Sequence, residues 1–590
     1  MPITFIPIGK MSADFGPGPG DHSWYLVNLI PSGDGGYTTI GEPDQVTFAT
    51  DIPCITAAPV LNAVRGVHGY SGAYTADKMY IALKDKIFMD GTDVSGMAYT
   101  NGTTYGMQFC TYGPYVFATN RASTDPIQVQ DVTIGGAFAN ITVGARCANP
   151  RAATICTYKN HVVLGNITVN EAGPATGYGA LLNGTYPSLI WWSGTDLPMY
   201  FGSPAEGDSP AVLGTDYRQT FDGDGEIVKL VATDSCVIIF KSQSILRMDG
   251  PPFQISLLSN QYGTRHPYSV KVMGRRVYFV SDFGPAYVDI DNNSVVSIGP
   301  HRISRALGVS DGHLGYTMPP GPRGAGTSFW GISSYWGSGG DPLGTTAAVD
   351  SFGRNVVFMF KNNVLSYGST SETLDLQDSG GVVVLVYNET NDEFSLWKVG
   401  SANCPAARAN SIGWVTERVP RQSEKRLPLG DIMFLQYYDN SGAGNPDKLR
   451  GLNLNSNSLV YEALGGYGTT ATFCLPFKLF SEIESGATSS IEAIKPIWYS
   501  EWETDKNPTF KARIYTTTLS GWGDWFGLNR CVVSDSHSSS DDGWLTVDTP
   551  SGKSHAVTLD IAADPLDEQG WTTIRGIYGI LVKYATNGAR

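Results

Sequence analysis

The chain has 590 residues, of which 42% are hydrophobic, so it can bury more than one sizeable core; this excludes a disordered chain and predicts two or three domains. Its formal net charge of −15 argues against stable binding to nucleic acid, because affinity for phosphates depends on clustered Lys and Arg side chains. Only 16% of the residues are charged, which is typical of a surface covered by partners or by copies of the same chain. A glycine-rich monomer with an ordinary surface is the alternative.

The N-terminal region, residues 1–45, is expected to be an arm and a strand that join a C-terminal domain. Residues 16–21 alternate glycine and proline and end in aspartate, a composition that excludes helix and regular strand. Residues 24–31 predict one apolar strand closed by proline. The first residues lack the basic segment of a secretory signal peptide, and no apolar run approaches the roughly 18 residues of a membrane span. We therefore expect neither export nor a membrane span.

Between residues 46 and 469, a short apolar strand, a tight turn and a second strand ending in aspartate or glycine recur along the chain. The clearest copies are residues 80–83 with 86–91, 236–240 with 244–250, 276–282 with 286–289, and 382–387 with 393–397. Weaker copies start near residues 115, 161, 355 and 432. Several starts lie about 35 to 50 residues apart, the length of a four-stranded blade. The repeat predicts a β-propeller of about six to eight blades.

Interruptions of this repeat predict loop insertions. Residues 166–187 are rich in Gly, Ala, Thr and Asn and separate two strands of one repeat, which indicates an insertion on one face of the propeller, and residues 337–342 form a second loop. A third, residues 416–426, gathers four Arg and Lys side chains in an otherwise acidic chain. A solvated loop and a docking site for an acidic partner both explain this basic cluster.

Residues 470–590 have a different pattern, with longer strands predicted at 470–483, 491–503, 509–518 and 573–586. They predict a separate β-sandwich or meander, to which the N-terminal arm contributes. Helical periodicity is confined to residues 301–307 and a few residues around 60–66. The predicted fold class is therefore all-β, a β-propeller with an additional β-sandwich-like domain.

The eight cysteines stand at positions 54, 110, 147, 156, 236, 404, 474 and 531 and form no CxxC pair and no Cys/His ligand spacing. Most lie in apolar, strand-like runs, so we expect buried free thiols of a protein made in a reducing cytoplasm. Disulfides are the alternative. No metal and no cofactor are predicted.

Templates for catalysis and ligand binding fit the sequence poorly. Residues 551–554 resemble the end of a phosphate-binding loop, but Val547 stands where the first glycine is required. Residues 289–300 place oxygen atoms at alternate positions as a calcium loop does, yet Ser294 and Pro300 replace the required Gly and Glu, which favours a hairpin turn. Residues 539–546 match part of an Asp-box but lack its tryptophan. We expect no enzymatic activity.

Two groups of residues are compatible with carbohydrate chemistry. Asp222, Asp224 and Glu226 concentrate three carboxylates, two of which suffice for glycoside hydrolysis, but a polar turn before a strand explains the same residues. The aromatic candidates are Trp191 with Trp192, and the set Trp498, Tyr499, Trp502, Trp522 and Trp525. These aromatic side chains either stack on sugars or fill a core or subunit interface.

The order of the strand motifs resembles that of a known family. The matching segments are Met1-Pro2-Ile3, Asp14-Phe15, 26–31, 188–193, 225–228, 237–240, 244–246, 263–269, 274–281, 298–303, 384–387 with Trp397, and 574–582. In this order they are similar to the packaged-DNA stabilisation proteins, also called tail hub or nozzle proteins, of short-tailed bacteriophages. The likeness spans most of the chain, which departs from the family by additions at 166–187, 313–350 and 405–430.

This resemblance implies a structural virion protein assembled in the host bacterial cytoplasm. Six copies would form a tube below the portal and its adaptor, contact tail fibres or spikes, retain the packaged DNA and later let it pass. An acidic wall that does not hold DNA, and low-charge aromatic faces between subunits, agree with that role. The alternative function is a carbohydrate-binding or carbohydrate-cleaving propeller at the host surface. A secreted adhesin would need the export signal that the sequence lacks.

Overall fold

The structure is a computed structural model of the chain. It describes residues 3–10, 23, 25–31, 36–39, 42–46, 64–72, 74–83, 85–100, 107–122, 124–141, 151–169, 184–201, 216–220, 225–251, 253–281, 283–299, 347–352, 355–360, 382–399, 415–418, 431–435, 450–458, 470–474, 488–500, 509–517, 528–537, 544–546, 555–562 and 574–587. No helix in these ranges is long and apolar enough to cross a membrane.

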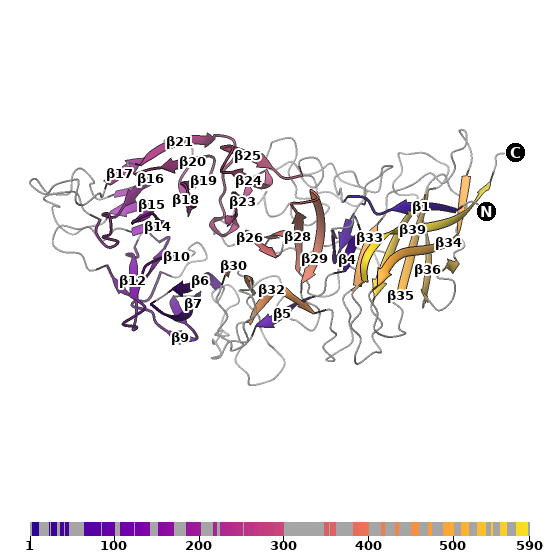
Figure 1. The fold of residues 1–590 in the computed structure, drawn as a ribbon, viewed down its shortest axis with the longest axis horizontal. Coiled ribbons are helices and arrows are strands. Elements are labelled where there is room, and N and C mark those ends of the chain that lie inside the picture. Colours follow the sequence, from indigo (N-terminus) through magenta and orange to yellow (C-terminus); the bar gives the residue numbers. More distant parts are fainter. Residues whose placement is uncertain are drawn as a thin grey trace, which may run out of the picture.

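The described residues form seven blades of four antiparallel strands around one axis (Figure 1). Blade I holds β6 (Val64–Gly72), β7 (Thr75–Leu83), β8 (Lys86–Met89) and β9 (Thr92–Asp93); blade II holds β10 (Met107–Tyr112), β11 (Tyr115–Asn120), β12 (Gln128–Asp131) and β13 (Ala139–Asn140); blade III holds β14 (Arg151–Tyr158), β15 (His161–Val169), β16 (Gly184–Trp192) and β17 (Asp216–Gln219). Blade IV holds β18 (Ile227–Ala232), β19 (Val237–Lys241), β20 (Ile245–Asp249) and β21 (Gln254–Ser259); blade V holds β22 (Lys271–Met273), β23 (Arg276–Ser281), β24 (Gly284–Asp289) and β25 (Ser294–Ser297). Blade VI holds β26 (Ala347–Phe352), β27 (Asn355–Phe360), β28 (Val382–Asn388) and β29 (Glu393–Val399); blade VII holds β30 (Val415–Arg418), β31 (Asp431–Leu435), β32 (Arg450–Ser458) and β5 (Glu42–Val46).

The ring is closed. The first strands β6, β10, β14, β18, β26 and β30 lie nearest the axis, and β30 of blade VII contacts β6 of blade I (Figure 1). Blade VII combines three strands from late in the sequence with β5 from the N-terminal region, which pairs antiparallel with β32. The predicted β-propeller is therefore confirmed, with a blade number inside the expected range. The expected boundary at residue 45 falls within β5, whose pairing places it in the ring.

Apolar cores lie between adjacent blades, because the second strand of a blade buries side chains on both of its faces. On β11, Val116 and Ala118 pack toward blade I whereas Phe117 packs toward blade III. On β19, Ile239 packs toward blade III and Ile238 toward blade V. A strand buried on both faces has a continuous apolar run rather than an alternating pattern. This explains why residues 237–240 are all apolar.

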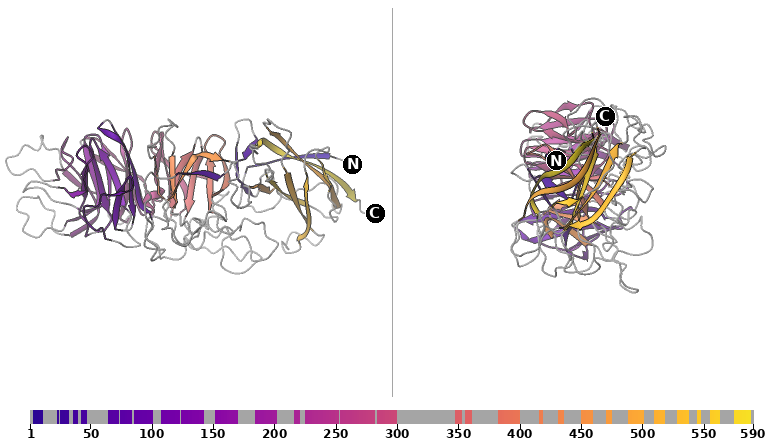
Figure 2. Two further views of the ribbon diagram at one scale, coloured as in Figure 1. Left: turned by 90° about the horizontal axis from the view of Figure 1, so that it is seen from below. Right: turned by 90° about the vertical axis from the view of Figure 1, so that its right-hand side faces the viewer.

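The remaining strands form a β-sandwich-like domain at the other end of an elongated molecule (Figure 2). One sheet holds β3 (Leu29–Pro31), β4 (Tyr37–Thr39), β39 (Ile574–Asn587), β34 (Thr488–Ser500) and β37 (Leu545–Thr546), with β1 (Ile3–Pro7) also paired to β39. The other holds β2 (Tyr25–Val27), β33 (Thr470–Cys474), β38 (His555–Ala562), β35 (Thr509–Thr517) and β36 (Leu528–His537). The prediction that the N-terminal arm joins this domain is confirmed, and the arm contributes strands to both of its sheets.

Among the predicted local elements, the paired strands of the repeat are confirmed, whereas one strand and one helix are wrong. The four clearest strand–turn–strand copies are confirmed as antiparallel pairs. The single strand predicted at residues 24–31 is wrong: Asn28 has a φ of 55° and divides it into β2 and β3, which belong to different sheets. Asn tolerates this left-handed conformation better than most residues. The helix predicted around 60–66 is wrong from Val64 onward, where β6 begins.

The predicted insertions are partly described. The insertion at 166–187 does separate two strands of one blade, but its ends belong to β15 and β16. Residues 337–342 and the helix candidate at 301–307 lie outside the described residues. The basic loop at 416–426 is wrong over its first three residues, which belong to β30, the innermost strand of blade VII. A four-residue strand with two charges has no apolar alternation, so the pattern concealed it.

Close packing of the inner strands generates a prediction at Gly66 in β6. A Cβ atom at this position would collide with the backbone carbonyl of Met107 in the adjacent blade. We expect Gly66→Ala to destabilise the protein by about 1–3 kcal/mol, because backbone cannot move aside as a flexible side chain does. Gly184→Ala is the control, since its Cβ would meet only the Tyr186 ring at 3.7 Å. Urea denaturation measures both; equal midpoints would contradict the close approach of blades I and II.

Candidate functional site

The acidic run at residues 222–226 is the first candidate for chemistry, and Glu226 is the member that the structure describes. Its Oε1 forms an ion pair with Nη2 of Arg121, and its Oε2 accepts a hydrogen bond of 2.9 Å from Nδ2 of Asn166. These partners come from blades II and III, whereas Glu226 precedes β18 of blade IV. Asp222 and Asp224 lie outside the described residues. Glu226 therefore links three blades through its carboxylate.

The tryptophan pair at the end of β16 is buried in the cores between blades. Trp191 is 3% exposed and meets Phe201 and Tyr217 edge to face, and Trp192 is 4% exposed and meets Phe253 in the same way at 4.7 Å between ring centroids. The prediction that these aromatic residues fill a core is confirmed, and neither indole is available to a sugar. The side chains of Trp498, Tyr499, Trp502, Trp522 and Trp525 lie outside the described parts of the chain.

The aspartate-rich segment after β24 is a hairpin turn, as expected. Oδ1 of Asp289 accepts the backbone N–H groups of Asp291 and Asn292 at 3.1 and 3.0 Å, and the turn joins β24 to β25. These hydrogen bonds lower the pKa of Asp289. Within the described ranges, no three His, Cys, Asp or Glu side chains are grouped to hold a metal ion.

Other sequence candidates are only partly visible. Residues 551–554 and most of the Asp-box-like segment lie outside the described residues, whereas Leu545 and Thr546 of that segment form β37. Cys110, Cys156 and Cys236 are free and buried, as predicted for the thiols. Burial raises the pKa of Cys110 to about 12, so this thiol is an apolar packing group and not a nucleophile at neutral pH.

Several polar contacts cross the boundaries between blades. On the inner strands, Oε1 of Gln108 accepts hydrogen bonds from Oγ1 of Thr154 at 2.9 Å and from Nζ of Lys229 at 3.1 Å, which joins blades II, III and IV. Thr154 also accepts the backbone N–H of Leu230 at 3.0 Å. Because Gln108 and Thr154 are almost fully buried, leaving either without a partner would be costly. The network therefore fixes how these blades meet.

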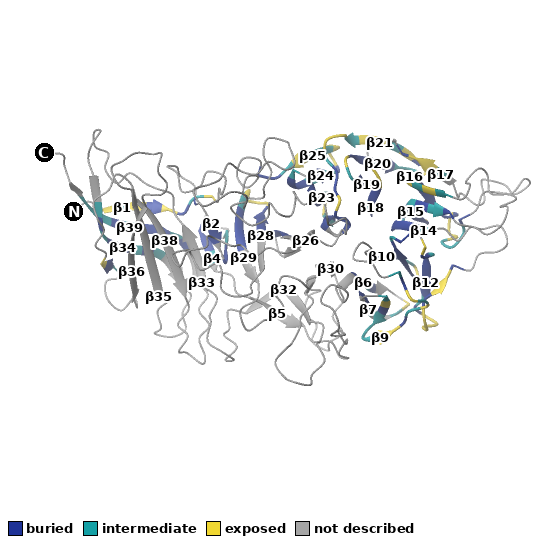
Figure 3. Cartoon of the chain, turned by 180° about the vertical axis from the view of Figure 1, so that it is seen from behind, coloured by how far each residue is buried: buried dark blue, intermediate teal, exposed yellow. Residues whose placement is uncertain are grey.

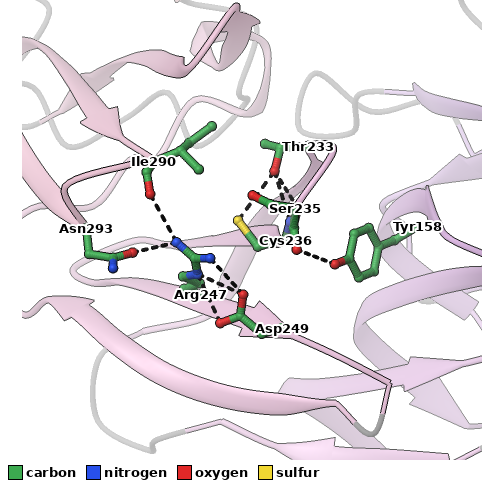
Figure 4. Close-up of polar contacts among 8 residues, drawn as sticks. All are labelled: Tyr158, Thr233, Ser235, Cys236, Arg247, Asp249, Ile290 and Asn293. Carbon is green, nitrogen blue, oxygen red and sulfur yellow. Dashed lines mark hydrogen bonds and ion pairs between the residues drawn. The ribbon is translucent and has the colours of Figure 1, made fainter.

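A second set lies at the turns of blades III to V (Figure 4). Arg247 on β20 donates from Nε to both carboxylate oxygens of Asp249 at 2.9 and 3.0 Å, and its Nη1 reaches the backbone oxygen of Ile290 at 3.1 Å and Oδ1 of Asn293. The guanidinium thus spans from blade IV to the last turn of blade V. Nothing in the sequence pattern marks Arg247, because its partners lie in a different repeat.

The segment 263–269, which carries part of the family resemblance, is the linker from blade IV to blade V. The backbone N–H of Thr264 donates to the backbone oxygen of Lys241 at 2.9 Å. Its hydroxyl Oγ1 donates to the backbone oxygen of Val280 at 2.7 Å. His266 precedes the short 3-10 turn η2 (Pro267–Ser269), and its backbone oxygen accepts Oγ of Ser269 at 2.7 Å. Burial, with a smaller effect of Arg265, lowers the pKa of His266 to about 4. The imidazole is therefore neutral at physiological pH.

The joint between ring and sandwich is a shared sheet. Strand β2 pairs in parallel with β29, the outer strand of blade VI, and antiparallel with β33, so one sheet of nine strands runs from blade VI into the sandwich. The backbone N–H of Asn28 extends the joint to the oxygen of Leu396 at 2.7 Å, and Lys10 donates from Nζ to the oxygen of Asn391 at 2.7 Å. The phenol of Tyr37 has a pKa raised by burial and by nearby Glu393. Ring and sandwich are therefore coupled through main-chain hydrogen bonds.

Comparisons with known proteins give the following. No protein-family model and no curated protein matches the chain. Among solved structures, BamB from Moraxella catarrhalis is similar over 77% of this chain and 97% of its own, at 10% identity and a TM-score of 0.26. The WD40 domain of SCAP from fission yeast is similar over 92% and 98%, at 11% identity and a TM-score of 0.25. Likenesses this weak carry no functional inference, and the propeller assignment rests on the strand pairings above.

The Arg247 contact predicts a matched pair of substitutions. We expect Arg247→Met to destabilise the protein by about 1–2 kcal/mol, because it leaves the backbone oxygen of the buried Ile290 without the donor from Arg247, whose side chain is 18% exposed. Arg275→Met removes an ion pair with Asp291 in which the arginine side chain is 83% exposed, and should leave the denaturation midpoint almost unchanged. Thermal and urea denaturation measure both. Similar losses in the two variants would contradict the bridging role of Arg247.

His266 predicts a pH dependence of stability. Its pKa is lower in the folded chain than the ordinary 6.5, so the folded state resists protonation of His266. The free energy of unfolding that depends on the neutral imidazole is fully present above pH 6.5 and is lost as pH falls toward 4, by up to about 3 kcal/mol. The free energy of unfolding, measured between pH 7 and pH 4, should fall less steeply in His266→Gln than in the unsubstituted protein. Parallel pH curves for the two proteins would contradict a buried neutral imidazole.

Proposed function

We propose that the chain is a structural protein of a short-tailed phage tail, a nozzle or hub built from six copies that retains packaged DNA and conducts it during ejection. The observation that carries this proposal is the joint, in which β2 and β29 merge ring and sandwich into one continuous sheet. A part that transmits load between two assemblies needs such a connection, because a flexible linker would let the two domains move independently.

The sandwich domain offers a surface for contact between subunits. Strand β1 pairs with β39 on one side, and its Ile3 and Phe5 side chains are 53% and 49% exposed while Ile6 is buried on the opposite face. An edge strand with exposed apolar side chains is a ready template for association with another chain. The net charge of −15 supports passage of DNA without adhesion. The contacts of Glu226 and the burial of Trp191 and Trp192 give the carbohydrate alternative no support.

Assembly tests this proposal. We expect native mass spectrometry of the purified full chain, at concentrations on the order of 1–100 μM, to show a hexamer, and negative-stain images to show rings with an open centre. Phe5→Asp should shift the population toward monomer by at least tenfold in the apparent association constant, because it places a charge in the apolar contact.

Ile134→Asp is the matched control, because Ile134 is 82% exposed on a turn of blade II and far from β1 in the fold. A monomer at every concentration would contradict the proposed nozzle. A hexamer that tolerates Phe5→Asp would leave the nozzle in place and remove β1 from its interface.

A further inference from the structure

The outer strand of a blade leaves one edge of main-chain groups unpaired, which invites another strand unless the edge is protected. Five of the seven blades in the described residues have such protection. β9 and β13 are only two residues long, and β17 carries Asp216 and Arg218. β5 contains Glu42, Pro43 and Asp44, and β29 is covered by β2.

Blades IV and V lack all of these devices. Strand β21 reads Gln-Ile-Ser-Leu-Leu-Ser and β25 reads Ser-Val-Val-Ser, without a charge or a proline. Leu257 on β21 is 47% exposed and Val296 on β25 is 36% exposed, and both strands lie on the rim of the ring (Figure 3). No strand among those described pairs with the outer edge of either. Since β21 has six residues and β25 four, β21 is the better template.

Strand β21 is fixed by packing on both faces, although no described strand covers its outer edge. It pairs with β20 from Gln254 to Ser259, Ile255 packs against the core between blades III and IV, and Leu258 packs against the core between blades IV and V. Oγ of Ser259 accepts the backbone N–H groups of Gln261 and Tyr262, which ends the strand. A template fixed on both faces loses little entropy when another strand is added.

Blade VI provides the precedent for what covers such an edge. There the outer strand β29 is completed by β2, a short extended segment that reaches the ring from outside it. We propose that β21 receives an extended segment of a different protein chain in the same way, by β-strand addition. Its unpaired main-chain groups select an extended backbone, its lack of charge selects an uncharged segment, and Leu257 favours an apolar side chain opposite it.

A synthetic peptide tests this directly. The probe is a fluorescein-labelled peptide of six alternating Val and Thr residues flanked by lysines, and fluorescence anisotropy measures its binding to the full chain. We expect saturable binding with a Kd on the order of 10–100 μM. Hydrogen exchange should show new protection at residues 254–259. The same peptide N-methylated at four consecutive backbone nitrogens should bind at least tenfold more weakly, because it cannot pair as a strand.

The matched protein variants are Leu257→Lys and Ile134→Lys, which add the same charge at two exposed apolar positions. Leu257→Lys should weaken peptide binding at least tenfold, because an edge lysine opposes strand addition, whereas Ile134→Lys should not change it. Equal binding of the N-methylated peptide, protection elsewhere than 254–259, or no saturation up to about 1 mM would overturn the proposal. So would a dimer that forms without peptide and is lost in Leu257→Lys, since the edge would then belong to a second copy of this chain.

Discussion

The sheets of the ring are apolar on both faces, so no blade is stable until a neighbour covers each face. This constraint determines the rest of the structure. The chain satisfies it for blades I to VI by simple succession, but the last blade needs a partner for its outer strand and must also contact the first. Strand β5 meets that need by pairing with β32, and β30 meets β6. The N-terminal region and the late repeats are therefore held together. This also brings together the strands that precede β5 and those that follow β32, which form the sandwich.

The same constraint explains why several buried or half-buried polar side chains lie at the boundaries between blades. Glu226, Arg247 and the network around Gln108 bind across blade boundaries, where apolar packing alone does not fix how two sheets meet. Hydrogen bonds have direction, so they select one arrangement among several with similar burial. The residues that suggested chemistry in the sequence are thus used for structure. The segment 263–269, which carries part of the family resemblance, has the same use, since Thr264 ties blade IV to blade V.

The sequence predicted the elements that local patterns control. Continuous apolar runs such as residues 237–240 marked strands buried on both faces, and tight turns marked hairpins, so the class of fold and the buried tryptophans were accessible. The pairing of β5 with β32 was not, because no local pattern names a partner some 400 residues away. The division at Asn28 was missed because the residues around it are uniformly apolar, and only its φ of 55° turns the chain from one sheet to the other. Arg247 gave no signal, since an arginine on a strand reads as surface.

The outer edges of the blades impose a second constraint on the fold. In a ring of separate sheets every blade has an outer edge, so a propeller carries as many adhesive sites as it has blades unless each is blunted. Charges, proline and shortness blunt edges at little cost to packing, because they act only at the rim. The edge of β29 is used instead, since β2 converts it into the joint with the sandwich. Strand β21 has no blunting residue, and no strand among the described residues covers it, so Leu257 keeps apolar surface in solvent. Folding alone gains nothing from that exposure, and a bound strand would remove it.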